Sequence, residues 1–208
     1  MTRIAIIGTG NIGGALARLW TQAGQQVSVA TREGSTPKQL PFGVTSGPAK
    51  VVASKAEIVL LAVPWAAAKE ALASCGDLSG KILVDCINPV LPTLEGLEFG
   101  GTTSASEQLQ QLVPQTYVIK AFNTIGAPLL GNAKFDGLEA DGYYCGDDAA
   151  AKSAVAPLIA AAGLRPFDAG PLRNARYLEA MAMLWIDLAL KRGRGPTFGF
   201  RMLERAAT

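Results

Sequence analysis

The feature that most constrains the fold is a glycine-rich turn close to the start of the chain. It follows a short apolar run, Ile4–Ile7, and has the spacing G-x-G-x-x-G. Its residues are Gly8, Thr9, Gly10, Asn11, Ile12 and Gly13. Apolar side chains then recur at helical spacing to about Ala23, and Gly24 follows as a C-cap. We therefore predict a strand over 3–7, a tight turn, and a helix over 11–23.

A strand, a glycine turn and a helix in this order are typical of a dinucleotide-binding unit. Gly8 permits the tight turn, Gly10 lets the backbone approach a pyrophosphate, and Gly13 lets helix and strand pack closely. Free N–H groups and the positive end of the helix dipole then face the phosphate charge. The alternative is an ordinary glycine-rich turn, which the position between strand and helix disfavours.

The end of the second predicted strand indicates which dinucleotide is bound. Proteins that bind NAD usually place an Asp or Glu there, about twenty residues after the glycines, to hold the ribose hydroxyl. This chain has Thr31 and Arg32, with Glu33 next to them. A hydroxyl followed by a guanidinium suits a 2′-phosphate, which favours NADP(H) over NAD(H). The alternative for Arg32 is a solvated surface arginine.

Apolar runs with strand composition recur along the chain, and segments of helical period lie between several of them. This alternation predicts an α/β fold, a doubly wound Rossmann-type sheet that is mainly parallel. We expect a dinucleotide-binding domain over residues 1–170 and a small helical C-terminal cap over 171–208 with one long helix, 172–190. A capping-box spacing predicts another helix from Ser104. The further strands are expected at Val27–Ala30, Ile58–Ala62, Ile82–Asp85, Tyr117–Ala121 and Arg165–Asp168.

Small or polar residues follow three of the later predicted strands. Ligands of doubly wound sheets bind outside the carboxyl ends of the strands, so these turns are expected to line the ribose and nicotinamide side of the cleft. For Pro64 and Pro89 taken alone, a proline that only ends the strand in a turn is an equally good interpretation. The turns are Val63-Pro64-Trp65, Asn88-Pro89 and Ala121-Phe122-Asn123. The long loop after Pro89, to about Thr103, is another candidate for a functional segment.

Composition excludes several classes of function. The chain of 208 residues has no histidine and a net charge of only +2, with Lys and Arg scattered. A hydrolase with a His base is therefore excluded, and neither nucleic acid nor a membrane is an expected partner. The cysteines are far apart, which predicts reduced thiols and no metal site. No run reaches the roughly twenty apolar residues of a membrane span, and we expect a cytoplasmic protein.

Taken together, several motifs make the chain resemble the NADPH:coenzyme F420 oxidoreductases. They are the glycine turn, Thr31-Arg32, Val63-Pro64-Trp65, the segments 104–107, 145–148 and 163–172, and a tail from Asn174 to Leu203. The segment Ala121-Phe122-Asn123 is similar to the cytosolic reductase domain of the six-transmembrane metalloreductases, which belong to the same superfamily.

This resemblance implies direct hydride exchange between NADPH and the ring of coenzyme F420 or a flavin-like acceptor. Such a reaction needs alignment of two rings rather than a catalytic side chain, so no residue is assigned as catalytic. By position, the resemblance places the NADP half on Thr9, Asn11, Ile12, Thr31 and Arg32. It places the nicotinamide between Val63, Pro64, Trp65, Asn88 and residues 121–123.

Other functions stay open at this point. One is a non-catalytic NADP(H) sensor, and another is a small-substrate dehydrogenase that uses Lys120 as general acid. The apolar tail helix is a candidate homodimer face, and packing on the parent domain is its alternative. That face carries Tyr177, Met181, Leu184, Trp185 and Leu188.

Overall fold

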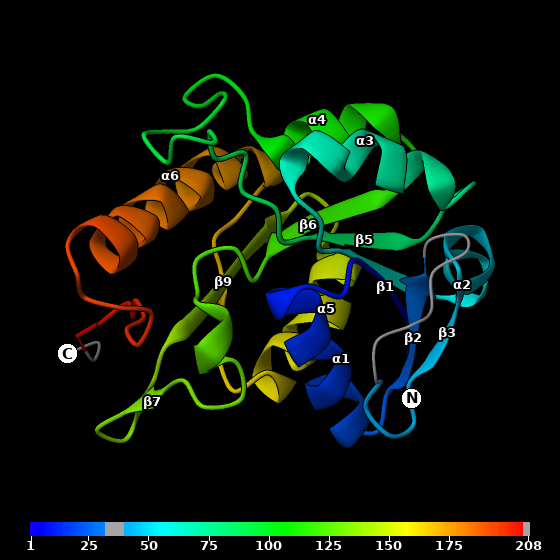
Figure 1. The fold of residues 1–208 in the computed structure, drawn as a ribbon, viewed down its shortest axis with the longest axis horizontal. Coiled ribbons are helices and arrows are strands. Elements are labelled where there is room, and N and C mark those ends of the chain that lie inside the picture. Colours follow the sequence, from blue (N-terminus) through cyan, green and yellow to red (C-terminus); the bar gives the residue numbers. More distant parts are fainter. Residues whose placement is uncertain (32–39, 206–208) are drawn as a thin grey trace.

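The computed structural model describes residues 1–31 and 40–205, and within them the chain forms one large sheet and a separate two-stranded one, β7 (Lys134–Phe135) with β8 (Leu138–Glu139) (Figure 1). The strand order is β10-β9-β6-β5-β4-β1-β2-β3. The strands from β3 to β6 in this order run parallel, β9 is antiparallel to β6, and β10 runs parallel to β9. Their bounds are β1 (Arg3–Ile7), β2 (Gln26–Thr31), β3 (Thr45–Pro48), β4 (Ile58–Leu61), β5 (Ile82–Asp85), β6 (Tyr117–Ala121), β9 (Asp141–Gly146) and β10 (Arg165–Asp168).

Helices cover both faces of the sheet. Helices α1 (Asn11–Gln22) and α5 (Ala149–Ala161) lie on one face, and α3 (Trp65–Ser74) and α4 (Ala105–Leu112) on the other (Figure 1). Helix α2 (Ala49–Lys55) packs on the same side as α3, near β1 and β2. This is the doubly wound Rossmann-type arrangement that the sequence predicts, and the prediction is confirmed.

The first strand shows why the fold takes this form. Ile4 and Ile6 pack among α1 and α5, whereas Ala5 and Ile7 pack among α2 and α3, and all four are buried. A strand without polar alternation needs cover on both sides, and crossover helices supply it. On the α1 side, the indole N–H of Trp20 donates to the carbonyl of Leu158 at 2.9 Å and so joins α1 to α5.

Three helical segments follow β10. They are a 3₁₀ turn (Leu172–Asn174), helix α6 (Ala175–Ile186) and a π-helical turn (Asp187–Lys191). The predicted single helix over 172–190 is therefore three helical segments. On the predicted dimer face, Tyr177 and Leu184 are exposed, whereas Trp185 stacks on Phe198. The division at residue 170 and the homodimer stay predictions.

The chain from Trp185 to Met202 folds back onto β9. Asp141 accepts the backbone N–H of Met202 at 2.6 Å and pairs with Arg165 at 2.5 Å. Burial raises the pKa of Asp141, but hydrogen bonds from Arg165 and Met202 outweigh it and the net shift is downward. The indole of Trp185 donates to the carbonyl of Phe198 at 3.0 Å. Within the described residues, no helix is both long and apolar enough to cross a bilayer.

Candidate active site

The glycine turn lies where the ends of β1 and β4 meet, and each glycine has its own steric reason. Gly8 has φ +103°, and a Cβ there would lie 2.3 Å from the carbonyl oxygen of Ala62. A Cβ on Gly13 would lie 2.0 Å from the carbonyl oxygen of Gly8. Both positions are therefore closed to any side chain. By contrast, a Cβ on Gly10 would meet nothing within 4 Å.

The open space at Gly10 is the observation that fits a bound pyrophosphate. Gly10 is the N-cap of α1, and among the described residues no side chain caps the first turn and no acidic residue lies in it. Thr9, Gly10 and Asn11 are exposed, and Ile12 is half-buried. The N-terminal N–H groups and the positive end of the α1 dipole are thus available to an anion.

Thr31 ends β2, the strand next to β1, on the side away from β4. This is where the sequence predicts the 2′-phosphate contacts. Thr31 is half-buried and is paired in register with Pro48 of β3. Arg32, the predicted guanidinium partner, lies outside the described residues.

The predicted turn Val63-Pro64-Trp65 follows β4, at the same sheet edge as the glycine turn. A Cβ on Gly8 would approach the side chain of Val63 to 2.9 Å, so the two turns are neighbours. Pro64 is the exposed N-cap of α3, which starts at Trp65. The Trp65 ring meets the Phe99 ring edge-on, with centroids 5.2 Å apart. Trp65 therefore links this turn to the loop that follows β5.

The predicted turns after β5 and β6 are hydrogen-bonded to each other. The Asn88 amide donates to the Asn123 carbonyl at 2.9 Å, and the Asn123 amide donates to the Asn88 side-chain oxygen at 3.0 Å. Asn123 also donates to the carbonyl of Leu178 in α6 at 2.9 Å. These bonds hold the two strand ends and α6 together.

Not every residue of these turns has a side chain at the surface. Pro89 and Ala121 are buried, and Phe122 is only 2% exposed. Phe122 has φ +62° and its ring packs edge-on against Trp20 of α1. The left-handed backbone at Phe122 directs its side chain into the core and turns the chain toward Asn123. Pro89, Ala121 and Phe122 thus shape this edge through packing and backbone.

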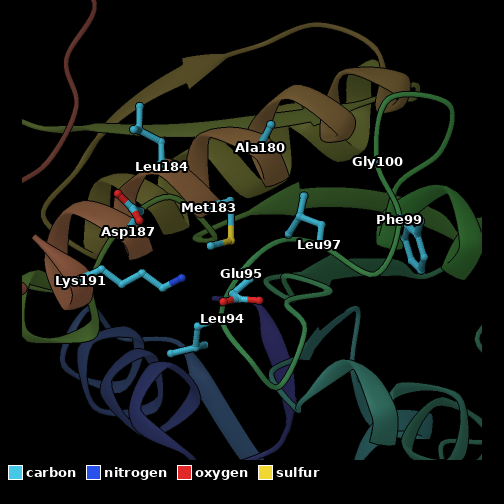
Figure 2. Close-up of a pocket in the computed structure, with 10 residues that line it drawn as sticks. All are labelled: Leu94, Glu95, Leu97, Phe99, Gly100, Ala180, Met183, Leu184, Asp187 and Lys191. Atoms are coloured by element: carbon cyan, nitrogen blue, oxygen red, sulfur yellow. The ribbon is translucent and has the colours of Figure 1, made fainter.

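A groove of about 550 Å³ opens between the loop after β5 and α6 (Figure 2). We call it the α6 groove. Its walls are mainly apolar, and its size is in the usual range for small-molecule sites. The apolar lining residues are Leu94, Leu97, Phe99, Ala180, Met183 and Leu184.

Charged side chains lie at one part of the α6 groove. Glu95 comes from the loop, and Asp187 and Lys191 come from the π-helical turn after α6 (Figure 2). Phe99 lines the groove and also contacts Trp65, so the groove adjoins the turn after β4. An apolar slot with a few charged groups at its rim suits a flat ring that carries a polar tail.

A fully buried ionic network lies at the ends of β5 and β6, on the side of α4 and α6. Lys120 Nζ is 2.8 Å from Asp85 Oδ2 and 2.8 Å from Glu179 Oε1. It also donates to the carbonyl of Ile87. Asp85 accepts from the Ser106 hydroxyl at 2.6 Å, and Glu179 accepts from the backbone N–H of Ala105. The network joins β5, β6, α4 and α6.

The surroundings of Lys120 argue against the hypothesis that it is a general acid. Its side chain has no exposed surface, and the three protons of its ammonium have three acceptors. Burial lowers the pKa of Lys120, but Asp85 and Glu179 outweigh it and the net shift is upward. A group with no access to the cleft and no tendency to lose its proton does not donate to a substrate.

The three cysteines are free thiols, as the sequence predicts. Burial raises the pKa of Cys75 to about 11 and that of Cys86 and Cys145 to about 12. They are protonated at neutral pH and are not activated nucleophiles.

Sequence reasoning missed two parts of the site. It did not find the α6 groove, although it marked the loop after Pro89 as a candidate. It also did not connect Asp85 with Glu179, which lie far apart along the chain. The available signal was a charged residue within or at the end of each of two apolar strands, Asp85 in Ile82–Asp85 and Lys120 in Tyr117–Ala121.

The fold and the glycine turn define a Rossmann-type dinucleotide-binding protein. A family model described as "NADP oxidoreductase coenzyme F420-dependent" matches residues 3–89. The F420-dependent NADP reductase of Methanothermobacter marburgensis is 31% identical over 91% of this chain and 93% of its own length. The chain belongs to the family of coenzyme F420-dependent NADP oxidoreductases.

Two further relatives are similar to most of this chain. A solved structure from Arthrobacter sp. FB24, assigned to the F420-dependent NADP reductases, has a TM-score of 0.87 and 31% identity. It is matched over 98% of this chain and 100% of that one. Metalloreductase STEAP3 of Rattus norvegicus is 33% identical over 87% of this chain. The chain spans only 36% of the length of that metalloreductase.

Proposed function

We propose that this protein transfers a hydride between NADPH and a flat-ring acceptor, coenzyme F420 or a flavin-like molecule. NADPH gives up the hydride and becomes NADP⁺, and the acceptor ring takes the hydride together with a proton from water. The α6 groove carries the proposal, because it offers an apolar slot for a second ring beside the strand ends that are expected to hold the nicotinamide.

In this proposal the residues of the chain bind and align rather than react. The first turn of α1 holds the pyrophosphate, and Thr31 and Arg32 hold the 2′-phosphate. Val63, Asn88 and Asn123 border the nicotinamide. The absence of histidine from the whole sequence is compatible with this chemistry, since bringing two rings together is the main requirement.

The direct experiment is NADPH oxidation by the purified protein with coenzyme F420 and FMN offered in parallel. Turnover with either compound supports the proposal, and the faster one identifies the acceptor class. Tight NADPH binding without turnover of any deazaflavin, flavin or quinone contradicts it and indicates a redox sensor.

The Arg32→Ala variant tests the 2′-phosphate site. We expect NADPH binding to weaken by about 1.5–3 kcal/mol, the range of a hydrogen bond to a charged group, and NADH binding to change little. Isothermal titration with both cofactors measures this. Equal losses for NADPH and NADH would show that Arg32 does not bind the 2′-phosphate.

The Ala180→Trp variant tests the α6 groove. Ala180 lines the groove and is exposed, so a large ring there fills the slot without disturbing the core. We expect the KM for the acceptor to rise by about tenfold, since filling a packed site costs about 1–3 kcal/mol, with NADPH affinity unchanged. The matched control is Tyr177→Trp, on the same helix and 72% exposed. Unchanged acceptor kinetics in Ala180→Trp would place the acceptor elsewhere.

A further inference from the structure

Among residues 1–31 and 40–205, the buried ionic network links three charged side chains, whereas the other ion pairs are isolated. Its members occupy the last residue of β5, Asp85, the penultimate residue of β6, Lys120, and Glu179 of α6. All three side chains are 0–1% exposed. Removing such charges from water costs free energy, and buried charges do not make a protein more soluble. Their presence in the interior therefore needs another explanation.

The hydrogen bonds define the charge of each member. Asp85 accepts from the Ser106 hydroxyl, from Lys120 and from the backbone N–H of Ile87, so both of its oxygens have donors. Glu179 accepts from Lys120 and from the Ala105 N–H. Donors on every side favour the ionised form of a carboxyl group, although burial outweighs Lys120 and the Ala105 N–H at Glu179 and raises its pKa. Lys120 faces only acceptors and is an ammonium.

These contacts join two carboxylates to a single ammonium, which leaves one negative charge in excess. The first N–H groups of α4 lie next to Glu179 and supply about half a positive charge. The net charge of the two carboxylates, the ammonium and the α4 N-terminus therefore remains negative. By contrast, the ion pair of Arg176 in α6 with Glu107 in α4, at 2.6 Å, is neutral.

The network lies directly behind the expected nicotinamide cleft. Lys120 and Asp85 both bind the backbone of Ile87, the residue before Asn88, and Ala121 follows Lys120. On α6, the carbonyl of Leu178 holds Asn123, and the next residue is Glu179. The same backbone segments thus carry the charges on one side and the candidate cleft residues on the other.

We propose that the network of Asp85, Lys120 and Glu179 places a net negative charge behind the nicotinamide cleft and thereby favours the oxidised, positively charged cofactor over the reduced one. The inference rests on the proposed position of the nicotinamide. A site that favours NADP⁺ makes bound NADPH a stronger hydride donor, because the positive charge that develops on its ring is stabilised. Asp85, Lys120 and Glu179 are positioning and electrostatic residues, since none of them reaches the cleft.

Glu179→Gln removes the charge and keeps most of the geometry. The Ala105 N–H and the Lys120 ammonium both contact Oε1 of Glu179, at 2.9 and 2.8 Å, and the Ala105 N–H also donates to Oε2 at 3.1 Å. The amide oxygen of a glutamine keeps the two bonds to Oε1, whereas the carboxylate charge and the longer bond to Oε2 are lost. The matched control is Glu107→Gln, which removes a carboxylate from the neutral and partly exposed pair between the same two helices.

The experiment measures the Kd of NADP⁺ and of NADPH by titration calorimetry, with no acceptor present. We expect Glu179→Gln to raise the ratio of the NADP⁺ Kd to the NADPH Kd by about three- to tenfold, the effect of one charge acting over roughly 10–15 Å of protein. Glu107→Gln is expected to leave the ratio within about twofold of wild type, because solvent reaches this partly exposed pair and screens its charges.

The outcomes separate this inference from the proposed function. An unchanged ratio in folded Glu179→Gln overturns the inference while the cofactor site stands. Wild-type protein that binds neither form of the cofactor overturns both. If Glu179→Gln does not fold, Asp85→Asn removes the other carboxylate, and a ratio that stays constant or falls in that variant also overturns the inference.

Discussion

The Lys120→Met variant is expected to unfold at a much lower temperature than the wild type. Removing the ammonium leaves the buried carboxylates of Asp85 and Glu179 without a counter-charge, and breaking a buried pair in this way costs about 3–5 kcal/mol. For a chain of this size, that loss lowers Tm by roughly 6–20 °C. Thermal unfolding followed by circular dichroism measures it.

The control for this variant is Lys152→Met. Lys152 pairs with Asp168 at 2.9 Å, but the Asp168 side chain is 43% exposed, and pairs of this kind contribute about 1 kcal/mol or less. A Lys120→Met protein as stable as Lys152→Met would show that the network is not held by its charges. Binding of NADPH by Lys120→Met at low temperature would further show that Lys120 supports the cleft without contacting the cofactor.

The second large effect is expected for Gly13→Ala. The new methyl group would lie 2.0 Å from the carbonyl oxygen of Gly8, a distance that no backbone tolerates, so α1 must move away from the turn. Overpacking of this severity costs about 3 kcal/mol or more, and the variant is expected to lose stability and NADPH binding together. Chemical denaturation and cofactor titration of the same preparation measure both losses.

Gly10→Ala is the matched variant in the same turn. Its methyl group meets nothing in the protein, so we expect the free energy of unfolding to stay within about 0.5 kcal/mol of wild type. NADPH binding is nevertheless expected to weaken by about 1–3 kcal/mol, because the methyl occupies the space of the pyrophosphate. Full NADPH affinity in folded Gly10→Ala would place the pyrophosphate away from this turn.

Much of the fold follows from local signals in the sequence. The strands β1, β5, β6 and β10 have the predicted bounds, and α1 ends within a residue of its prediction. Other elements lack such signals. β3 has the sequence Thr45-Ser46-Gly47-Pro48, which has no apolar run, and it forms because β2 has a free edge. The tail is predicted as one regular helix, but a 3₁₀ turn precedes α6 and a π-helical turn follows it.

Strand β9 shows a further limit of local reasoning. Glycine is unfavourable in strands, yet β9 contains Gly142 and Gly146. A Cβ at either glycine would lie 2.3 Å from an isoleucine, Ile159 of α5 or Ile119 of β6. The glycines are therefore required by close packing from α5 and β6, which only the assembled fold supplies.

The candidate site likewise has one part that the local sequence predicts and another part that it does not. The glycine turn could be predicted because its strand, turn and helix are continuous in sequence. The α6 groove and the network could not, because their residues come from segments as far apart as Asp85 and Glu179. A pairing at that separation leaves no periodic pattern in the sequence, and only the charged residues of otherwise apolar strands indicate it.

The wide separation of the network residues also sets an order of assembly during synthesis on the ribosome. The strands β1, β2 and β4 and the glycine turn leave the ribosome early, and domains and their parts begin to fold as they emerge. Lys120 emerges with Asp85 already available, but Glu179 follows only after nearly sixty more residues. Until then, the N-terminus of α4 lacks the carboxylate that binds it, and Asn123 lacks the carbonyl of Leu178. The residues of the proposed dinucleotide site therefore emerge first, and α6, which lines the proposed acceptor groove, emerges later.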